Sequence, residues 1–462
     1  MTCTRNSPFS VPVGTSGRSC AHVLRGLAMK KRRRPGRVAR KRRRKCGMRV
    51  QSVSLCHQAS YVRLIRFLKQ RGFASTILLP AQFTDTGRGL QTLKTVKPGQ
   101  LLISLPQACL LTTTTVLNSY LGPLIKGWMP HPSPLLVLCV FLVLERHRVP
   151  LSEWYPYIDV LPTTYTCPVY FADDVIALLP KVVQRHALEQ RASVQELHSS
   201  NQDFFRWLQP LVIEPVEEVF TYEALRWAWC TVNTRSVFMA HSPSQFLSGQ
   251  DVCALAPFLD LLNHRPDVQV SANFNSDTRC YEIHSVSGID RYQQAFINYG
   301  SHDNQRLLVE YGFVATNNPH SVVYLDKDIL CKVLQGDSNL QQKIKFLSQN
   351  ELLSNLTLSS EGPGWRLQTV VRVLSLPQTQ FGLWKAVLLG QRLCEEKERW
   401  CTQTIRTLCV HRLQDTDTAL EKISKLQQQC DASVTEQLDV VMALRQEERI
   451  ILGKCLEILT DS

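Results

Sequence analysis

The spacing of apolar and polar residues predicts two kinds of secondary structure that alternate along the chain. Residues 61–72 place apolar side chains on one face of a short helix that ends at a glycine. Residues 86–112 contain short alternating runs between glycine turns, a pattern typical of small antiparallel strands. Residues 113–240 are mainly helical in pattern, 241–251 read as a polar loop, and 252–315 return to short strands around Asn and Gly turns.

Beyond about residue 325 helical patterns dominate, with clear examples at 365–376 and 434–459. The predicted fold class is therefore α+β, in the order strands, helical insertion, strands and helical C-terminal domain. The two β-rich segments lie about 140 residues apart, and neither has enough strands for a stable sheet. We expect the two segments to join in one sheet, with the active site where they meet.

The net charge of +14 comes from the first 50 residues. These residues include sixteen Lys/Arg and no Asp/Glu, whereas the rest of the chain has 37 basic and 39 acidic residues. The block at 30–45, KKRRRPGRVARKRRRK, repels itself and has very few apolar residues, so residues 1–50 are predicted to be a disordered basic tail. Two basic clusters with a short spacer suit a nuclear import signal or a weak nucleic-acid contact. A merely solvated tail and an organellar transit peptide are the alternatives.

The nearly neutral body argues against nucleic-acid binding as the main function, because no recognised RNA- or DNA-binding module accompanies it. The longest apolar run, at 135–144, has ten residues against the roughly 20 that a membrane span requires, so we expect a buried helix and no membrane partner. The sixteen Cys form no CxxC pair and no close Cys/His cluster. This pattern predicts no metal site and favours reduced thiols in the nucleus and cytoplasm.

Four short segments combine polar or aromatic residues with turns. They are TGRGL at 86–90, DLLNHRP at 260–266, FINYG at 296–300 and LLVEYGF at 307–313. The second is interpreted as an apolar strand that ends in Asn-His, and the third as the end of a strand. Taken singly, each has an ordinary structural explanation, because GxG, Asn-His and Tyr-Gly sequences all occur in common turns.

In their order and spacing, the four segments resemble the SET domain of protein methyltransferases. The more specific resemblance is to the branch typified by plant Rubisco large-subunit methyltransferase, in which a helical insertion divides the SET domain. It covers roughly residues 58–460. The resemblance implies a SET domain at 58–315 with its insertion at about 113–250. It also implies a helical Rubisco-methyltransferase-type substrate-binding domain at 325–462.

The resemblance further implies S-adenosyl-L-methionine as the cofactor. The backbone of Arg88, Gly89 and Leu90 would contact this cofactor near its methionine part. Arg235 would pair with the cofactor's α-carboxylate, a task that suits a guanidinium group. The alternative for Arg235 is a position on a helix surface, but an unpaired arginine is costly in a buried, Trp-rich helix.

The later motifs receive their roles in the same way. Asn263 and His264 would bind the ammonium group and the adenine ring, largely through backbone carbonyl and amide groups. Tyr299 would line the methyl-transfer channel, and Tyr311 would be the catalytic tyrosine. A metal at His264 is not expected, because no second ligand lies at a suitable spacing.

The implied reaction is methyl transfer to lysine side chains of a protein substrate, a histone or another protein, by a monomeric enzyme. The branch also contains a histidine methyltransferase, but that type lacks the tyrosine found here as Tyr311. It also has a polar side chain where this chain has Val237, a residue of the substrate channel. A non-catalytic SET module that binds chromatin or another protein is the alternative from a different class.

One segment departs from the pattern of the family. The family usually has Gly-(Glu/Asp)-Glu-(Val/Ile) before the Tyr-Gly strand, whereas residues 291–295 read RYQQA. We therefore expect a different turn and a different charge beside the site.

Overall fold

The computed structural model describes residues 52–74 and 77–461. The predicted basic tail at 1–50, with its import signal or nucleic-acid contact, lies outside these described residues. The strands are β1 (Ser52–Ser54), β2 (Leu78–Phe83), β3 (Gly87–Thr92), β4 (Leu101–Pro106), β5 (Ser236–Phe238), β6 (Cys253–Leu255), β7 (Asn263–His264), β8 (Val270–Asn275), β9 (Cys280–Ser285), β10 (Gln294–Ile297), β11 (Val323–Leu325), β12 (Leu356–Ser359) and β13 (Gly362–Pro363).

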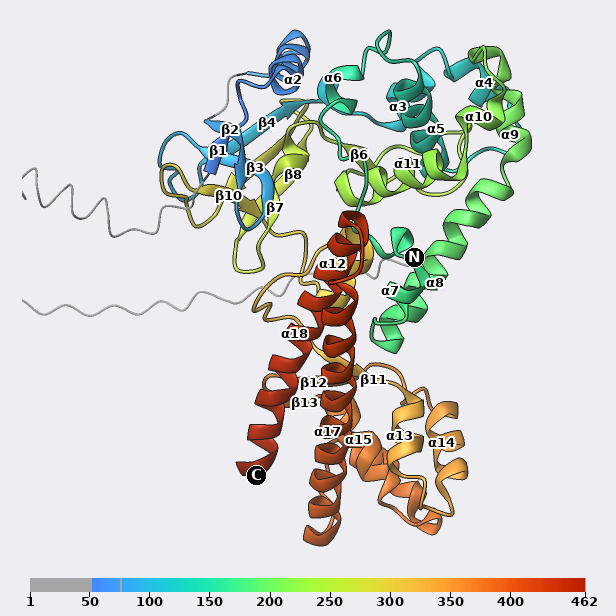
Figure 1. The fold of residues 1–462 in the computed structure, drawn as a ribbon, viewed down its shortest axis with the longest axis vertical. Helices are drawn as coiled ribbons and strands as arrows, with labels where there is room; N and C mark the ends of the chain where they lie inside the picture. The colour runs from blue at the N-terminus through green and yellow to red at the C-terminus, as the bar shows by residue number, and fades with distance from the viewer. Residues whose placement is uncertain (1–51, 75–76, 462) are drawn as a thin grey trace, which may run out of the picture. The chain divides into compact units, whose positions relative to one another are not determined.

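The two β-rich segments do come together, as predicted (Figure 1). The first sheet has the order β1-β2-β3-β10-β7, and the second has the order β4-β9-β8. The expectation of one sheet was wrong, because the strands of each segment are shared between two sheets. In the first sheet β10 lies antiparallel to β3, with Leu90 opposite Ala295, and parallel to β7, with Phe296 opposite Asn263. Strand β10 therefore joins the GxG segment to the Asn-His segment.

A helical insertion separates β4 from β5, as the sequence predicts. Its helices are α3 (Thr113–Leu117), α4 (Gly122–Gly127), α5 (Pro134–His147), α6 (Tyr155–Ile158), α7 (Asp173–Ile176), α8 (Lys181–Ser199), α9 (Gln202–Trp207), α10 (Val216–Val219) and α11 (Tyr222–Arg235). Before the insertion, α2 (Ala59–Gln70) buries Leu64 and Leu68 on one face.

Helix α5 contains the apolar run and is buried along its length. Ser133 caps it by accepting a hydrogen bond from the backbone N–H of Leu136, and Pro134 occupies the first turn, where its missing N–H costs nothing. All side chains from residue 136 to 144 are buried. Each large apolar side chain contributes about 1.5–3 kcal/mol on burial, so α5 anchors the main core. Within the described part of the chain, no helix has both the length and the apolar composition needed to cross a bilayer.

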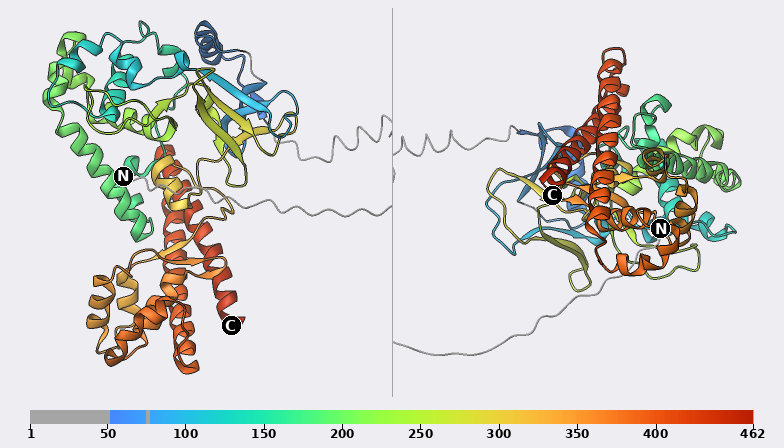
Figure 2. Two further views of the ribbon diagram at one scale, coloured as in Figure 1. Left: turned by 180° about the vertical axis from the view of Figure 1, so that it is seen from behind. Right: turned by 90° about the horizontal axis from the view of Figure 1, so that it is seen from below.

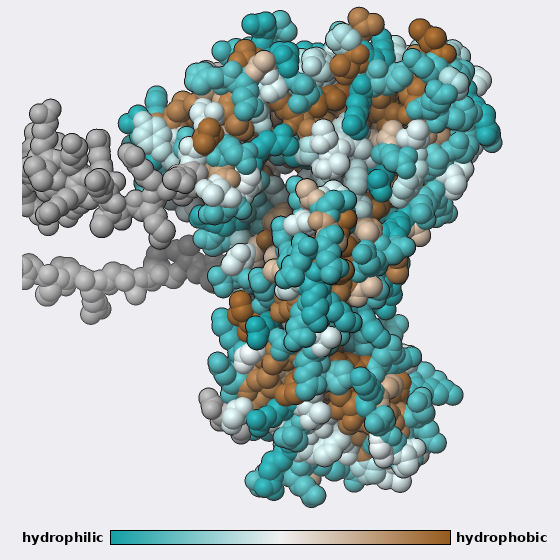
Figure 3. All heavy atoms as spheres, in the orientation of Figure 1, coloured by the Kyte–Doolittle hydropathy of each residue, from teal (hydrophilic) through white to brown (hydrophobic). Residues whose placement is uncertain are grey.

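The C-terminal region has its own small sheet, β11-β12-β13, and its own apolar core. Its helices are α13 (Lys327–Val333), α14 (Leu340–Gln349), α15 (Trp365–Leu374), α16 (Trp384–Leu388), α17 (Glu395–Leu426) and α18 (Ala432–Asp461). The long helices α17 and α18 run side by side in both views of Figure 2. On the face shown in Figure 3, the surface over these two helices is mainly hydrophilic.

Two local predictions were wrong. Residues 252–315 are not all strands and turns, because Asn304–Tyr311 form helix α12. Asp303 caps its first turn, and Gly312 ends it in the left-handed conformation, with φ at 79°. The predicted apolar strand at 260–266 is a short 3₁₀ helix, Leu259–Leu261, followed by the two-residue strand β7.

Candidate functional site

The GxG segment and the Asn-His segment meet through a side-chain hydrogen bond. The Nδ2 atom of Asn263 donates to the backbone oxygen of Arg88 at 2.9 Å. This amide passes directly over Gly89, because a Cβ atom on Gly89 would lie 3.0 Å from Asn263 Nδ2 and 2.6 Å from Gln294 Nε2. The absence of a side chain at Gly89 thus permits the close approach of two neighbouring strands. Leu90 is buried beside it.

The side chain of Arg88 leaves the sheet and binds the insertion. Its Nη1 atom donates to the backbone oxygen of Val160 at 2.5 Å. Arg88 also lies near enough to Asp260 to lower the pKa of that carboxyl group. The predicted role of Arg88 depends on its backbone, and the position of its side chain is compatible with that role.

Arg235, the last residue of α11, forms a buried ion pair that the sequence did not predict. Its Nη1 atom lies 3.1 Å from Oδ2 of Asp260, and only 3% of the Asp260 side chain is exposed. The hydroxyl of Tyr157 donates to the same carboxylate oxygen at 3.0 Å. Burial raises the pKa of Asp260, although Arg235 and Tyr157 oppose the shift. Burial lowers the pKa of Arg235, but Asp260 and two tyrosines outweigh it, so the guanidinium stays charged.

Sequence interpretation missed Asp260 and the two tyrosines around this ion pair. The hydroxyl of Tyr165 lies 2.7 Å from that of Thr231, one helical turn before Arg235. Burial raises the pKa of Tyr165, and the charge of Arg235 opposes this shift. Asp260 could have been found, because a lone carboxylate within the apolar run APFLDLL requires a buried partner. No comparable signal marks Tyr157 and Tyr165.

His264 is held by the residue predicted to line the channel. The backbone N–H of Tyr299 donates to Nδ1 of His264 at 3.1 Å, so the neutral ring has its proton on Nε2. Only 8% of His264 is exposed, and burial lowers its pKa to about 4. The rings of His264 and Tyr299 lie 5.2 Å apart. His264 is therefore an uncharged hydrogen-bond donor at neutral pH.

The two predicted tyrosines lie ring to ring. The centroids of Tyr299 and Tyr311 are 5.0 Å apart with an angle of 38° between the planes. The hydroxyl of Tyr299 donates to the backbone oxygen of Leu262 at 2.7 Å. Phe313 and His302 flank Tyr311, with ring centroids 6.4 Å and 6.0 Å away. Burial raises the pKa of both tyrosines, so both hydroxyls remain protonated at neutral pH.

The segment that departs from the family pattern lies beside Gly89. Tyr292 has φ at 66°, in the left-handed region that favours glycine, the residue the family usually has in this turn. Gln294 is buried, and its Oε1 atom accepts a hydrogen bond from the hydroxyl of Thr86 at 2.8 Å. The turn that we expected to differ from the family is thus at Tyr292, and the expected difference in charge is at Gln294.

Three buried polar atoms in this region have no hydrogen-bond partner within the described chain. They are Nε2 of His264, Nε of Arg235 and Nε2 of Gln294. Buried donors usually find a partner, so a group of unpaired ones suits a polar ligand that bears acceptors. Across residues 52–74 and 77–461, no three His, Cys, Asp or Glu side chains are grouped as metal ligands.

Val237 takes a less direct position. It lies on β5 opposite Ala254 of β6 and packs, half-buried, against the main core. Val237 follows Arg235 by two residues, and Arg235 forms the ion pair with Asp260 near the other predicted residues. The structure thus gathers the predicted cofactor residues and the two tyrosines, and places Val237 on the strand that follows Arg235.

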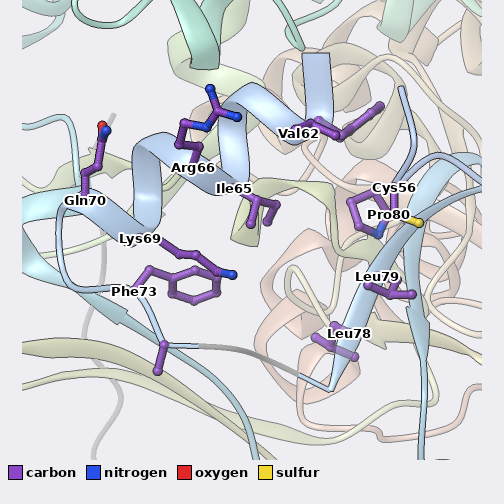
Figure 4. Close-up of a pocket in the computed structure, with 12 residues that line it drawn as sticks. Cys56, Val62, Ile65, Arg66, Lys69, Gln70, Phe73, Leu78, Leu79 and Pro80 are labelled. Carbon is purple, nitrogen blue, oxygen red and sulfur yellow. The ribbon is translucent and has the colours of Figure 1, made fainter. Parts of the chain in front are cut away.

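A separate cavity of about 650 Å³ lies between α2 and the start of β2 (Figure 4). Apolar Val62, Ile65 and Leu79 line it together with the cations Arg66 and Lys69. None of the predicted site residues lines this cavity.

The chain is similar to known proteins over most of its length. A family model described as Rubisco LSMT substrate-binding matches residues 335–452. SET domain-containing protein 4 of Mus musculus is 46% identical over 433 residues, which cover 93% of this chain and 98% of that protein. Actin-histidine N-methyltransferase of Homo sapiens is 28% identical over 56% of this chain and 43% of that protein.

The fold also matches a solved structure, described as the SET domain of LSMT bound to lysine and AdoHcy. The TM-score is 0.58 at 17% identity, and the match covers 87% of this chain and 92% of that chain. This likeness establishes an α+β SET fold with a helical C-terminal region, as the sequence predicts.

Proposed function

The chain belongs to the SET domain-containing protein 4 family, and on that premise we propose that it is a protein-lysine N-methyltransferase that uses S-adenosylmethionine. One observation carries the proposal. Segments more than 170 residues apart in sequence meet where Asn263 binds Arg88. The same strand pairing leads through His264 and Tyr299 to Tyr311.

The unpaired polar atoms suit the proposed cofactor. Nε of Arg235 would donate to a carboxylate, while Asp260 on its other side fixes the guanidinium group. The backbone from Arg88 to Leu90 would lie along the methionine part, and Asn263 and His264 would bind the ammonium group and adenine. S-adenosylmethionine supplies the methyl group on a positively charged sulfur.

The tyrosine pair would act on the acceptor amine. A lysine with a pKa near 10.4 must lose a proton before it can attack, which costs about 4 kcal/mol at pH 7.4. Burial among Tyr299, Tyr311 and Phe313 disfavours the charged ammonium form and so reduces this cost. The protonated tyrosine hydroxyls and nearby backbone oxygens would orient the neutral amine in line with the methyl group, so alignment supplies much of the rate.

Histidine is the alternative acceptor, because a relative at 28% identity is named an actin-histidine N-methyltransferase. Tyr311 and apolar Val237 favour lysine, since the histidine-specific type has neither. We further propose a histone or another lysine-containing protein as substrate, a monomeric enzyme, and entry into the nucleus directed by residues 30–45 in addition to a cytoplasmic pool.

The test is to incubate the protein with radiolabelled S-adenosylmethionine and either core histones or nuclear extract. Tyr311→Phe should abolish the transfer of label, while Tyr281→Phe, a buried tyrosine on β9, should transfer it as the wild type does. Mass spectrometry of the labelled band would then distinguish lysine from histidine. Cofactor binding without transfer to either acceptor mixture would favour the non-catalytic protein-binding alternative, and absence of cofactor binding would refute the enzyme.

A further inference from the structure

Helix α12 carries Tyr311 at its last residue, and the C-terminal region holds its first turn. Asp303 caps the helix, and its second carboxylate oxygen accepts a hydrogen bond from the hydroxyl of Tyr324 at 2.8 Å. Tyr324 belongs to β11, the first strand of the C-terminal sheet. The N-terminal cap of the helix that carries Tyr311 is therefore shared with the C-terminal region.

A second link joins α12 to α18. Nε2 of Gln305 lies 3.4 Å from Oε1 of Glu448, and both side chains are buried. Glu447, the residue before Glu448, accepts a hydrogen bond from the backbone N–H of Asn317 at 3.0 Å. Leu308 of α12 packs in one apolar cluster with residues of α18, so the polar link is enclosed by apolar contacts.

Buried charges surround this second link. The other carboxylate oxygen of Glu448 lies 3.2 Å from Arg445 and 3.8 Å from Arg412. Arg445 also donates to the backbone oxygen of Leu178 in the insertion, at 2.9 Å and 3.0 Å. Removing one partner of a buried ion pair is strongly destabilising, because it leaves an uncompensated buried charge. The cluster therefore links α18 to the insertion through Arg445 and to α12 through Glu448.

Helix α12 is short enough to transmit a shift as a rigid body. Its eight residues span about 12 Å. The Oδ1 atom of Asn304 accepts from Ala315 at 3.1 Å, which closes the loop after the helix onto its start. At the far end, Thr166 donates to the backbone oxygen of Gly312 at 2.6 Å. A displacement of the first turn would thus move Tyr311 relative to Tyr299.

We infer that the C-terminal region sets the position of Tyr311 through α12, with Tyr324 and Glu448 as positioning residues. The effect of this coupling on methyl transfer rests on the proposed function, whereas the mechanical coupling itself does not.

The coupling is tested by hydrogen–deuterium exchange of the full chain, read at the amides of residues 307–311. Tyr324→Phe removes one hydroxyl, and Glu448→Gln removes one charge. Each should raise exchange in α12 by about 10-fold. The exchanged pair Gln305→Glu with Glu448→Gln restores only the amide–carboxylate contact, since the ion pairs of Glu448 with Arg445 and Arg412 stay broken. Exchange in this double variant should therefore fall part of the way back from the rate of Glu448→Gln toward the wild-type rate. Glu398→Gln, which breaks the paired hydrogen bonds to Arg372 inside the C-terminal region, is the matched control and should leave α12 unchanged.

Activity gives the second measurement. Tyr324→Phe should lower the maximal rate of methyl transfer to nuclear-extract proteins by about 10- to 100-fold, because a misplacement of about 1 Å has that effect. The Kd for S-adenosylhomocysteine should not change. Wild-type exchange in both positioning variants, or equal exchange in the Glu398→Gln control, would refute the coupling. If the wild type transfers no methyl group, the proposed function fails, and the exchange result alone decides the coupling.

Discussion

The Nη1 atom of Arg235 lies 3.1 Å from Oδ2 of Asp260 in a pair that is almost closed to solvent. Removing one partner leaves an uncompensated buried charge, so Arg235→Met should lower the free energy of unfolding by about 3–5 kcal/mol. The double variant Arg235→Met with Asp260→Asn removes both charges and should lose less than this. Urea unfolding measures both values.

A matched surface pair provides the control for that experiment. Arg265 and Asp267 lie 2.7 Å apart with about half or more of each side chain exposed. Arg265→Met should therefore unfold close to the wild type, because exposed ion pairs contribute little. If Arg235→Met and Arg265→Met lowered the free energy of unfolding equally, burial of the Arg235–Asp260 pair would not explain its contribution to stability.

His264 predicts a dependence of stability on pH. Its pKa is lowered to about 4 in the folded protein, against an ordinary value of about 6.5 in the unfolded chain. The unfolded state therefore takes up the proton first as the pH falls. The contribution of His264 is complete above pH 6.5 and declines as the pH falls toward 4, by about 1.4 kcal/mol for each pH unit between the two pKa values.

Urea unfolding of the wild type and of His264→Gln at several pH values between 7 and 4 tests this dependence. The variant should show a shallower fall in the free energy of unfolding across that range. His302, whose pKa burial also lowers, contributes in the same direction and remains in both proteins. Parallel curves for wild type and variant would show that His264 is not the source.

Tyr292 predicts a stabilising substitution. A side chain at its left-handed φ of 66° costs about 1–2 kcal/mol. Glycine relieves that cost but loses about 0.5–1 kcal/mol in backbone entropy on folding. Tyr292→Gly should thus gain up to about 1 kcal/mol in thermal unfolding, whereas Tyr292→Ala keeps the Cβ atom and should gain nothing. A gain in the alanine variant would assign the effect to the ring.

Gly89 predicts a steric effect on the site. A Cβ atom at this position would meet Gln294, Asn263 and Phe83 at 2.6–3.1 Å, so Gly89→Ala should lower stability by about 1–3 kcal/mol. It should also weaken the binding of S-adenosylhomocysteine in calorimetry. Gly336→Ala has no neighbour within 4 Å and serves as the control. Unchanged binding by Gly89→Ala would place the ligand elsewhere.

Sequence patterns predict those helices that are specified by residues close together in the chain. Helix α5 follows from an uninterrupted apolar run behind a Ser-Pro cap, and α15 and α18 follow from helical spacing. Helix α12, which we did not predict, could also have been predicted from the sequence, because Asp303 is a typical N-cap residue and Gly312 a typical C-terminal residue of a helix. Nearby Asn and Tyr-Gly turns favoured the strand interpretation instead.

Contacts between distant segments explain what the sequence could not predict. Nothing in the spacing of Arg235 and Asp260 indicates that they pair, since the pairing depends on where α11 ends relative to a 3₁₀ turn. The division of the strands into two sheets likewise depends on register across the insertion. The roles of the individual site residues remain predictions.

The position of β10 between β3 and β7 has a consequence for biosynthesis. Gln91 on β3 pairs with Gln294, about 200 residues later, and β7 has β10 as its neighbour. During translation the edge of β3 that pairs with β10 therefore stays unpaired until the insertion and β10 have been synthesised. Strands with an unpaired edge are prone to aggregate at this stage. A protein cut within residues 113–250 would regain the candidate site only if both pieces reassembled.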